Sequence, residues 1–502
     1  MSDWGGGYVT DVGYVAGYHP EQAPGHLALA ALISGVACEI IERPEELSYL
    51  ELGAGLGFGT TLLAASNPSW RVTAIDFNPE HVAAARAFAA EAGVGNVTFL
   101  EADLATLSDQ PMAALVPEAD VASLHGLWSW VSEETRAGIL KLLGAKVRAG
   151  GLVHVSYNAL PAWQGALGLQ RVVREAGRRL AGRSDRQAAA GIGVARALVA
   201  AGARHLAADP FVKQLLERLS GAAPGYLAHE FMNAAWKPVF HVDVATDMAE
   251  AKFSWVGSAR LYENFPDLMM NEAERAEAAR FDDPLLFELI KDISGGPALR
   301  HDVYVRGARR LGENERNRTL SGVMLTLTTR PSRFAYEFEV PAGKANLHRG
   351  FYEPAVEALA ATPQTVGALL ARPGIEPGHA NPPELAAMLV GSGQAMVVLR
   401  PAAGPLPALD RFHAAAARLA GRFDKLDRPI ALASHRLGGG LVVPALELMI
   451  LSRLVIEGAA EPALWARLIA PGLEAEQAEG LGKEIARILD ERTQIWRLAG
   501  VV

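Results

Sequence analysis

An acid and several glycines follow an apolar segment near the start of the chain, in a pattern that could bind a nucleotide-like ligand. The segment Tyr49–Leu52 carries Glu51, and the turn after it holds Gly53, Ala54, Gly55 and Gly57. Glycine lets the backbone turn sharply and lets a ligand approach it closely. An apolar helix is expected from Thr60, and the N–H groups at a helix start favour polar or anionic ligand groups. The loop is therefore a candidate binding turn, with a glycine-rich turn without any ligand as the alternative.

The glycine spacing separates this loop from two common phosphate-binding loops. The dinucleotide fingerprint G-x-G-x-x-G would need glycine at the position of Phe58, and the P-loop would need a lysine after its last glycine. The remaining pattern, acid-x-G-x-G-x-G, resembles the cofactor loop of class I S-adenosylmethionine (SAM) methyltransferases. That resemblance implies that SAM is the cofactor and that Glu51 lies near its sulfonium and amino end.

A second carboxylate stands at the end of the next predicted strand, Trp70–Asp76. Asp76 follows Gly57 by about 20 residues, the offset at which a strand-end carboxylate meets a ribose in nucleotide-binding folds. A carboxylate can accept hydrogen bonds from both ribose hydroxyls. Asp76 and the neighbouring Phe77 are therefore candidate cofactor contacts.

Two later strands are also followed by polar side chains. Asp103 and Leu104 come after Val97–Glu101, and His125 comes after Ala119–Leu124. In class I methyltransferases an acid at the first of these places binds the adenine amino group, and its apolar neighbour packs on the ring. The resemblance thus implies that Asp103 and Leu104 hold the adenine, while His125 is a candidate base or cofactor contact.

Strands and helices alternate through this first part of the chain. Such alternation predicts an α/β fold with a parallel, doubly wound sheet, whose ligands lie at the carboxyl ends of the strands. The resemblance specifies a Rossmann-like sheet of seven strands that ends with an antiparallel pair. We expect Phe253–Ala259 and Asp302–Arg306 to form that pair, and we also expect a strand near Val239–Val242.

Composition shifts, together with what the resemblance implies, suggest four sections. They are a SAM-binding core at 1–160, a helical insertion at 161–240, the last strands of the core at 241–310, and an α+β region at 311–502. Short helices followed by strand-like segments make the last section winged-helix-like, and it is expected to be a regulatory or protein-binding region. Before the first strand, Tyr8, Tyr14 and Tyr18 are expected either to fold over the cofactor as a lid or to pack on the surface.

The 502 residues carry a formal net charge of −9, which argues against a general nucleic-acid-binding protein. Cys38 is the only cysteine, and the histidines show no metal-ligand spacing, so no metal site is expected. No secretory signal is visible, and the apolar run Leu27–Cys38 is too short to span a bilayer. A cytoplasmic protein is the expectation.

Three motifs narrow the resemblance. They occupy 124–131 (LHGLWSWV), 156–163 (SYNALPAW) and 229–238 (HEFMNAAWKP). Together they resemble bacterial methyltransferases that carry a methyltransferase regulatory domain, a group that includes the rickettsial-type protein-lysine methyltransferases. The resemblance covers the core, the insertion and, more loosely, the C-terminal region. Methyltransferases of planar amide or base nitrogens carry Asn-Pro-Pro-Tyr after the fourth strand, so glutamine and adenine acceptors are disfavoured.

Aromatic residues near the ends of the fourth and fifth strands are candidates for the acceptor site. An amine must be neutral to accept a methyl group, and an aromatic pocket would lower its pKa by removing water. Candidate substrate contacts are Trp128, Trp130 and Trp163, each of which could instead be a core residue. Tyr157 and Asn158 are candidate catalytic residues that would position the acceptor.

Three functions stay open at this point. The first is an N-methyltransferase of protein lysine, with a protein or peptide substrate. The second is a SAM-dependent enzyme for a small metabolite or peptide, with the extra sections forming a homodimer. The third is a SAM-binding regulator without catalysis.

Overall fold

The computed structural model describes residues 7–13, 16–372, 381–458 and 461–502 of the chain, so Tyr14 lies outside the described residues. Its centre is a seven-stranded sheet with the strand order β3-β2-β1-β4-β5-β7-β6. The first five strands in this order, from β3 through β1 to β5, are parallel to one another. Strand β7 is antiparallel to both of its neighbours, β5 and β6. This is the class I methyltransferase sheet that the sequence predicts.

The strand boundaries follow the predicted apolar segments closely. The strands of the central sheet are β1 (Ser48–Leu52), β2 (Arg71–Asp76), β3 (Val97–Glu101), β4 (Ala119–Leu124), β5 (Val147–Asn158), β6 (Phe253–Ser258) and β7 (Leu299–Arg306). The expected antiparallel pair is therefore confirmed, with the second strand starting three residues earlier than predicted. The strand expected near Val239–Val242 is wrong, because helix α10 (His241–Glu250) already begins there and only Val239 bridges to Ala159.

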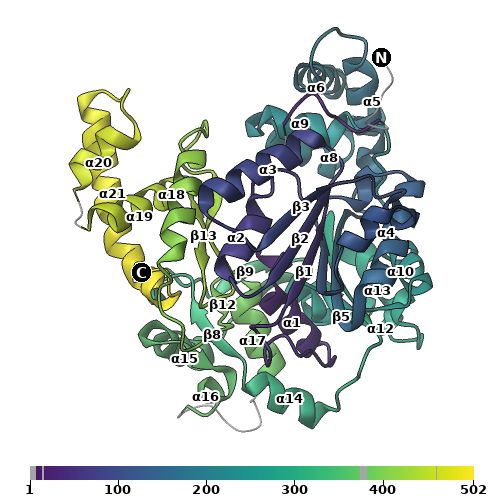
Figure 1. Cartoon of the computed structure of the whole chain (residues 1–502). Coiled ribbons are helices and arrows are strands. Elements are labelled where there is room, and N and C mark those ends of the chain that lie inside the picture. Colours follow the sequence, from purple (N-terminus) through teal and green to yellow (C-terminus); the bar gives the residue numbers. More distant parts are fainter. Residues whose placement is uncertain (1–6, 14–15, 373–380, 459–460) are drawn as a thin grey trace.

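Helices cover both faces of the sheet (Figure 1). Those of the core are α1 (Pro24–Ile33), α2 (Phe58–Ser66), α3 (Pro79–Ala92) and α4 (Glu133–Lys146). Their ends are encoded locally. Asn78 caps α3 by accepting a hydrogen bond from the Glu80 N–H, Pro79 occupies its first turn, and Gly93 ends it in the left-handed conformation.

The insertion after β5 is helical, as expected, and lies at the top of Figure 1. Its helices are α5 (Leu167–Gly177), α6 (Ser184–Ala200), α7 (Arg204–Ala207), α8 (Pro210–Arg218) and α9 (Pro224–Phe231). They form a hydrophobic cluster of their own, which also contains Val9, Val12 and Trp163. The N-terminal segment is thus attached to the insertion as well as to the core.

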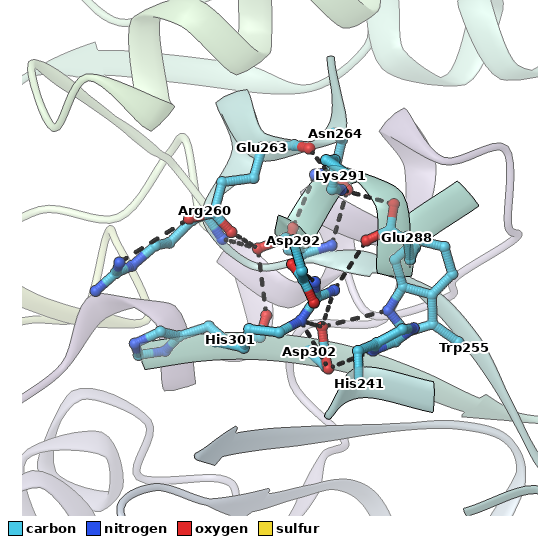
Figure 2. Close-up of polar contacts among 12 residues, drawn as sticks. His241, Trp255, Arg260, Glu263, Asn264, Glu288, Lys291, Asp292, His301 and Asp302 are labelled. Atoms are coloured by element: carbon cyan, nitrogen blue, oxygen red, sulfur yellow. Dashed lines mark hydrogen bonds and ion pairs between the residues drawn. The ribbon is translucent and has the colours of Figure 1, made fainter. Parts of the chain in front are cut away.

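A network of charged side chains is buried on the outer face of β7, against α10 and α13 (Pro284–Gly295) (Figure 2). The Arg300 guanidinium donates to Asp292 at 2.6 Å, to Glu288 at 2.9 Å and to Asp302 at 2.9 Å. The Lys291 ammonium donates to Glu288 at 2.6 Å. All five residues are at most 4 % exposed. Two cationic groups thus face three carboxylates, so each buried ion has a partner of opposite charge, as burial of ions requires.

The C-terminal region adds small sheets and helices at the left of Figure 1. Strand β8 (Met324–Leu327) pairs with β11 (Gln364–Thr365) and β12 (Ala395–Val397), β9 (Glu337–Val340) with β10 (Gly343–Asn346), and β13 (Pro429–Ser434) with β14 (Gly439–Pro444). Its longer helices are α14 (Glu313–Ser321), α15 (Arg349–Ala361), α17 (Pro382–Gly391), α18 (Ala408–Ala420), α19 (Ala445–Glu457), α20 (Pro462–Ile469) and α21 (Ala475–Leu498). The winged-helix-like character of this region stays a prediction.

The hairpin of β13 and β14 packs directly on α2, the helix that begins at the glycine loop. The Asn67 amide donates to the Gly438 carbonyl at 3.1 Å, and the Ser66 hydroxyl donates to the Gly439 carbonyl at 3.0 Å. Arg400 donates to Asn67 Oδ1 at 2.6 Å and to Glu45 at 2.7 Å. The C-terminal region is thereby attached to the helix behind the predicted cofactor loop.

Candidate functional site

Two cavities meet at the carboxyl ends of β1, β2 and β4. The larger has a volume of about 280 Å³, and its lining includes Asp76, Asp103 and Trp130. The smaller measures about 60 Å³ and is lined by Glu51, by the glycine loop, and by Ala16, Gly17, His19 and Gln22 of the N-terminal segment. Gly53, Gly55 and His125 line both cavities. The glycine loop and His125 therefore connect two compartments of one site.

The glycine loop needs glycine for its backbone and for its packing. Gly53, Gly55 and Gly57 all have positive φ angles, of 75°, 53° and 68°. A Cβ atom on Gly57 would lie 2.6 Å from the Ala85 Cβ and 2.8 Å from the Phe99 ring. Only glycine fits this position, because the α2 helix start approaches α3 and β3 so closely.

Asp76 holds the loop from the end of β2. One of its carboxylate oxygens accepts the Gly55 N–H at 2.8 Å, and the other accepts the Asn78 N–H at 3.0 Å. Each carboxylate oxygen has about two acceptor positions, so each retains capacity for a ribose hydroxyl. Because Asp76 also lines the larger cavity, its position agrees with the predicted ribose contact.

The side chains predicted for the adenine lie further along the same cavity. Asp103 is exposed at the cavity wall and accepts the Ala105 N–H, while Leu104 is buried beside it. Phe77 also lines this cavity, and the Tyr8 ring meets it edge to face with ring centroids 5.3 Å apart. An acceptor, an apolar surface and aromatic edges thus surround a space suited to a planar base.

Glu51 lies in the smaller cavity and is almost fully buried. Its carboxylate accepts hydrogen bonds from the Thr60 hydroxyl and from the Gln22 amide. Burial raises the pKa of Glu51 to about 7, although the two hydrogen bonds act to lower it. Ala54 and Gly57 line the same cavity. The acid of the loop therefore faces the compartment in which the resemblance places the amino-acid end of the cofactor.

His125 stands where the two cavities join. Its Nδ1 lies 3.0 Å from the Ser156 hydroxyl, and its ring stacks on His19 with centroids 3.7 Å apart. Burial lowers its pKa well below the ordinary value, and His19 and His154 add to the effect. The imidazole is thus neutral at pH 7, so it does not repel a cationic group in the site.

The structure brings only one of the three predicted tryptophans to the cavity. Trp130 lines it, together with Leu127. Trp128 is fully buried in the core, because the short 3-10 helix 128–130 directs its side chain inward. The Arg136 guanidinium donates a hydrogen bond to the backbone carbonyl of Trp128. Trp163 packs in the insertion against Phe211, and its indole N–H donates to the Ala298 carbonyl at 2.9 Å. The predicted substrate contacts of Trp128 and Trp163 are therefore replaced by packing roles.

Tyr157 and Asn158 are also corrected. Tyr157 is completely buried on the face of β5 opposite His125, and its hydroxyl donates to Asp302. Asn158 is turned to the insertion, where its amide donates to Glu230 at 2.9 Å. Successive residues of a strand point to opposite faces, so these two neighbours could not both face the site. Neither side chain lines the described cavities.

Replacing Tyr157 with phenylalanine is expected to lower stability and to leave the chemistry intact. The change removes one hydrogen bond to a buried carboxylate, which costs about 1.5–3 kcal/mol. We expect a lower melting temperature, with kcat and the affinity for SAM within about twofold of wild type. Thermal unfolding measures the stability, and steady-state kinetics measure kcat. A large fall in kcat without any loss of stability would show that Tyr157 acts in the active site.

Tyr18 is not placed at the cavities either. Its hydroxyl accepts the Gly440 N–H at 3.0 Å, so the side chain reaches the β13–β14 hairpin rather than the cofactor loop. Its neighbours His19 and Gln22 line the smaller cavity instead. Sequence reasoning missed Gln22, which bridges Glu51 and the Ser123 hydroxyl by hydrogen bonds of 3.2 and 3.0 Å. The sequence signal that could have identified Gln22 is its position as a polar residue just ahead of the apolar helix α1.

None of the helices in the described part of the chain combines the length and hydrophobicity that a bilayer crossing requires.

Comparison with known proteins agrees with this geometry. The model of a methyltransferase domain matches residues 50–151, and the model of a predicted methyltransferase regulatory domain matches residues 223–306. The second match includes β6, β7 and α13, and therefore the buried charge network.

Among curated proteins, the uncharacterized protein sll1526 of Synechocystis is 30 % identical over 366 residues, which cover 73 % of this chain and 71 % of the relative. The uncharacterized protein RP028 of Rickettsia prowazekii is 27 % identical over 131 residues, covering 26 % of this chain and 49 % of that protein. Among solved structures, PKMT2 from Rickettsia typhi, alone and in complex with AdoHcy, shares the fold with a TM-score of 0.68 at 14 % identity. That likeness covers 97 % of this chain and 99 % of PKMT2. Taken with the seven-stranded sheet and the glycine loop, these similarities show that the chain belongs to the class I SAM-dependent methyltransferases that carry a methyltransferase regulatory domain.

Proposed function

We propose that this methyltransferase acts on an amine nitrogen, the side-chain amine of lysine in a protein. The observation that carries the proposal is the larger cavity, whose lining combines the carboxylates at the strand ends with Leu127 and Trp130. These two side chains offer an apolar and aromatic surface in the cavity where the methyl donor would bind. The likeness in fold to PKMT2, a rickettsial protein lysine methyltransferase, along nearly the whole chain supports the choice of a protein acceptor.

The residues of the two cavities fit SAM. Asp76 would hold the ribose, Asp103 and Leu104 the adenine, and Glu51 with the glycine loop the amino-acid end. When bound, SAM supplies a methyl group that is already activated on a sulfonium. The work left to the protein is then to align donor and acceptor, to exclude water and to keep the acceptor nitrogen neutral.

A lysine amine has an ordinary pKa of about 10.4 and is charged at pH 7. Burial beside Leu127 and Trp130 would lower that pKa, because removal of water disfavours the charged form. Aromatic faces also stabilise a methylated ammonium by cation–π contact. The neutral His125 itself adds no positive charge beside the acceptor.

Transfer of labelled methyl from SAM to a lysate tests this proposal. We expect label in protein bands and, after hydrolysis, in methylated lysine. Trp130→Ala should raise the KM for the protein acceptor by about tenfold while SAM binds as before, since an acceptor contact acts on KM. The Asp76→Ala variant serves as the inactive control. Label only in small molecules would favour the alternative of a metabolite methyltransferase, and label on other side chains would overturn the lysine assignment.

A further inference from the structure

Three histidines converge beside the junction of the two cavities. His125 follows β4, His154 lies within β5, and His301 lies within β7. One ring nitrogen from each lies within 4.8 Å of the others, and the shortest distance, between His154 Nε2 and His301 Nδ1, is 3.1 Å. Figure 2 shows the His301 ring pointing away from the buried charge network, toward the other face of the sheet.

The ring positions leave a common centre for one ion. The three pairs of ring centroids are 5.3, 5.5 and 6.2 Å apart, with ring planes that differ by 24°, 32° and 9°. A point about 3.3 Å from all three centroids exists in such a triangle. A metal–nitrogen bond of 2.0–2.1 Å and about 1.1 Å from nitrogen to ring centre give about 3.2 Å. The spacing of the three rings is therefore compatible with one metal ion between them.

Two of the rings contact serine hydroxyls through Nδ1, which leaves their Nε2 atoms available to bind such an ion. His154 Nδ1 lies 3.0 Å from Ser123 Oγ, and His125 Nδ1 lies 3.0 Å from Ser156 Oγ. Each serine can accept the Nδ1 proton, which leaves the Nε2 lone pair for a metal. Metal-bound histidines in proteins are typically held in this way through their other ring nitrogen.

Two of the three proposed ligands lie inside the fold. His154 and His301 are at most 2 % exposed.

We propose that His125, His154 and His301 form a binding site for one divalent transition metal ion of the Zn²⁺ class. Imidazole nitrogens prefer such ions, whereas Mg²⁺ and Ca²⁺ prefer oxygen ligands. Three protein ligands leave at least one coordination position open. Because His125 lines both cavities, that position would face the methyl-transfer site. The proposal depends on these residues alone and not on the identity of the acceptor.

Metal analysis of the full chain without a histidine tag tests the site. After dialysis against a chelator, Zn²⁺ is added back and bound metal is counted per chain, and Co²⁺ is titrated while its visible spectrum is recorded. We expect one ion per chain and the intense bands of nitrogen-ligated, four-coordinate Co²⁺. Ser123→Ala and Ser156→Ala should each weaken Zn²⁺ binding by about 10- to 100-fold, as loss of a hydrogen-bond partner of a ligand does.

His154→Ala and His301→Ala should abolish stoichiometric binding, with circular dichroism as the check on folding. His205→Ala is the matched control, because His205 is exposed on α7 and should leave binding unchanged. The wild-type chain provides a test that needs no folded variant. Absence of a stoichiometric ion and of Co²⁺ bands in wild-type protein that still binds SAM would overturn the metal site. Loss of binding in His205→Ala would also contradict it.

Discussion

Replacing Asp76 with alanine is expected to reduce the affinity for SAM by roughly 10²- to 10⁴-fold. The carboxylate offers one remaining acceptor position on each oxygen, and each hydrogen bond to a charged group contributes about 1.5–3 kcal/mol. The variant also loses the bond to the Gly55 N–H, which holds the loop in its left-handed turns. Both effects weaken cofactor binding, so Asp76 should be the most sensitive position of the site.

Calorimetric titration with SAM and with AdoHcy measures this loss directly. Asp103→Ala is the matched control: that carboxylate is exposed and should cost about tenfold, in keeping with one hydrogen bond at a solvated position. A melting curve without ligand separates weak binding from misfolding. Affinity that is unchanged in folded Asp76→Ala protein would refute the position of the cofactor.

The second large effect is expected on stability. Asp302→Ala should lower the free energy of unfolding by about 3–5 kcal/mol, because it removes one of the three carboxylates that accept hydrogen bonds from the buried Arg300 guanidinium. The hydroxyl of Tyr157 and the ring of His241 lose their partner at the same time. Urea unfolding measures the loss, and Asp282→Ala, an exposed site, should change stability by less than about 0.5 kcal/mol.

The same carboxylate predicts a dependence of stability on pH. Burial alone would raise the pKa of Asp302, but Arg300 and His241 lower it far below the ordinary value. A folded-state pKa below that of the unfolded chain, about 3.9, gives stability that is present above that pH and is lost as the pH falls. Wild-type protein should therefore lose stability more steeply below about pH 4 than Asp302→Ala does. Equal slopes for both proteins would contradict the assignment.

The sequence predicted the sheet from local signals, and the same signals are the basis for the proposed cofactor contacts. Glu51, Asp76, Asp103 and His125 each follow an apolar strand, and parallel strands bring such ends to one edge. The glycine spacing then excluded two other ligands. These are properties of short segments, and the structure places the residues accordingly.

The acceptor side could not be predicted in the same way. Trp128 and Trp130 lie two residues apart on one short turn, yet one is buried in the core and the other lines the cavity. Which of them faces the cavity depends on the packing of β5 and the insertion, which no local pattern encodes. Alternation along β5 could have excluded one of Tyr157 and Asn158, but not both.

The histidine cluster shows a different limit of prediction from sequence. His125, His154 and His301 are far apart in the chain, and they meet because β5 pairs with both β4 and β7. Sequence spacing finds metal ligands that share a helix or a loop, so it gives no information on side chains that three separate segments of the chain bring together. Register between strands is the information that was missing.

The hairpin of β13 and β14 on α2 has a thermodynamic consequence. Its hydrogen bonds to Ser66 and Asn67 stabilise the helix whose first residues form the cofactor turn. Coupling free energies are reciprocal. If SAM binds more tightly while the hairpin is attached to α2, a partner that draws the hairpin away weakens SAM binding by the same factor by which SAM weakens the binding of that partner. The supply of methyl donor and the occupancy of the C-terminal region would then report on each other through a single helix.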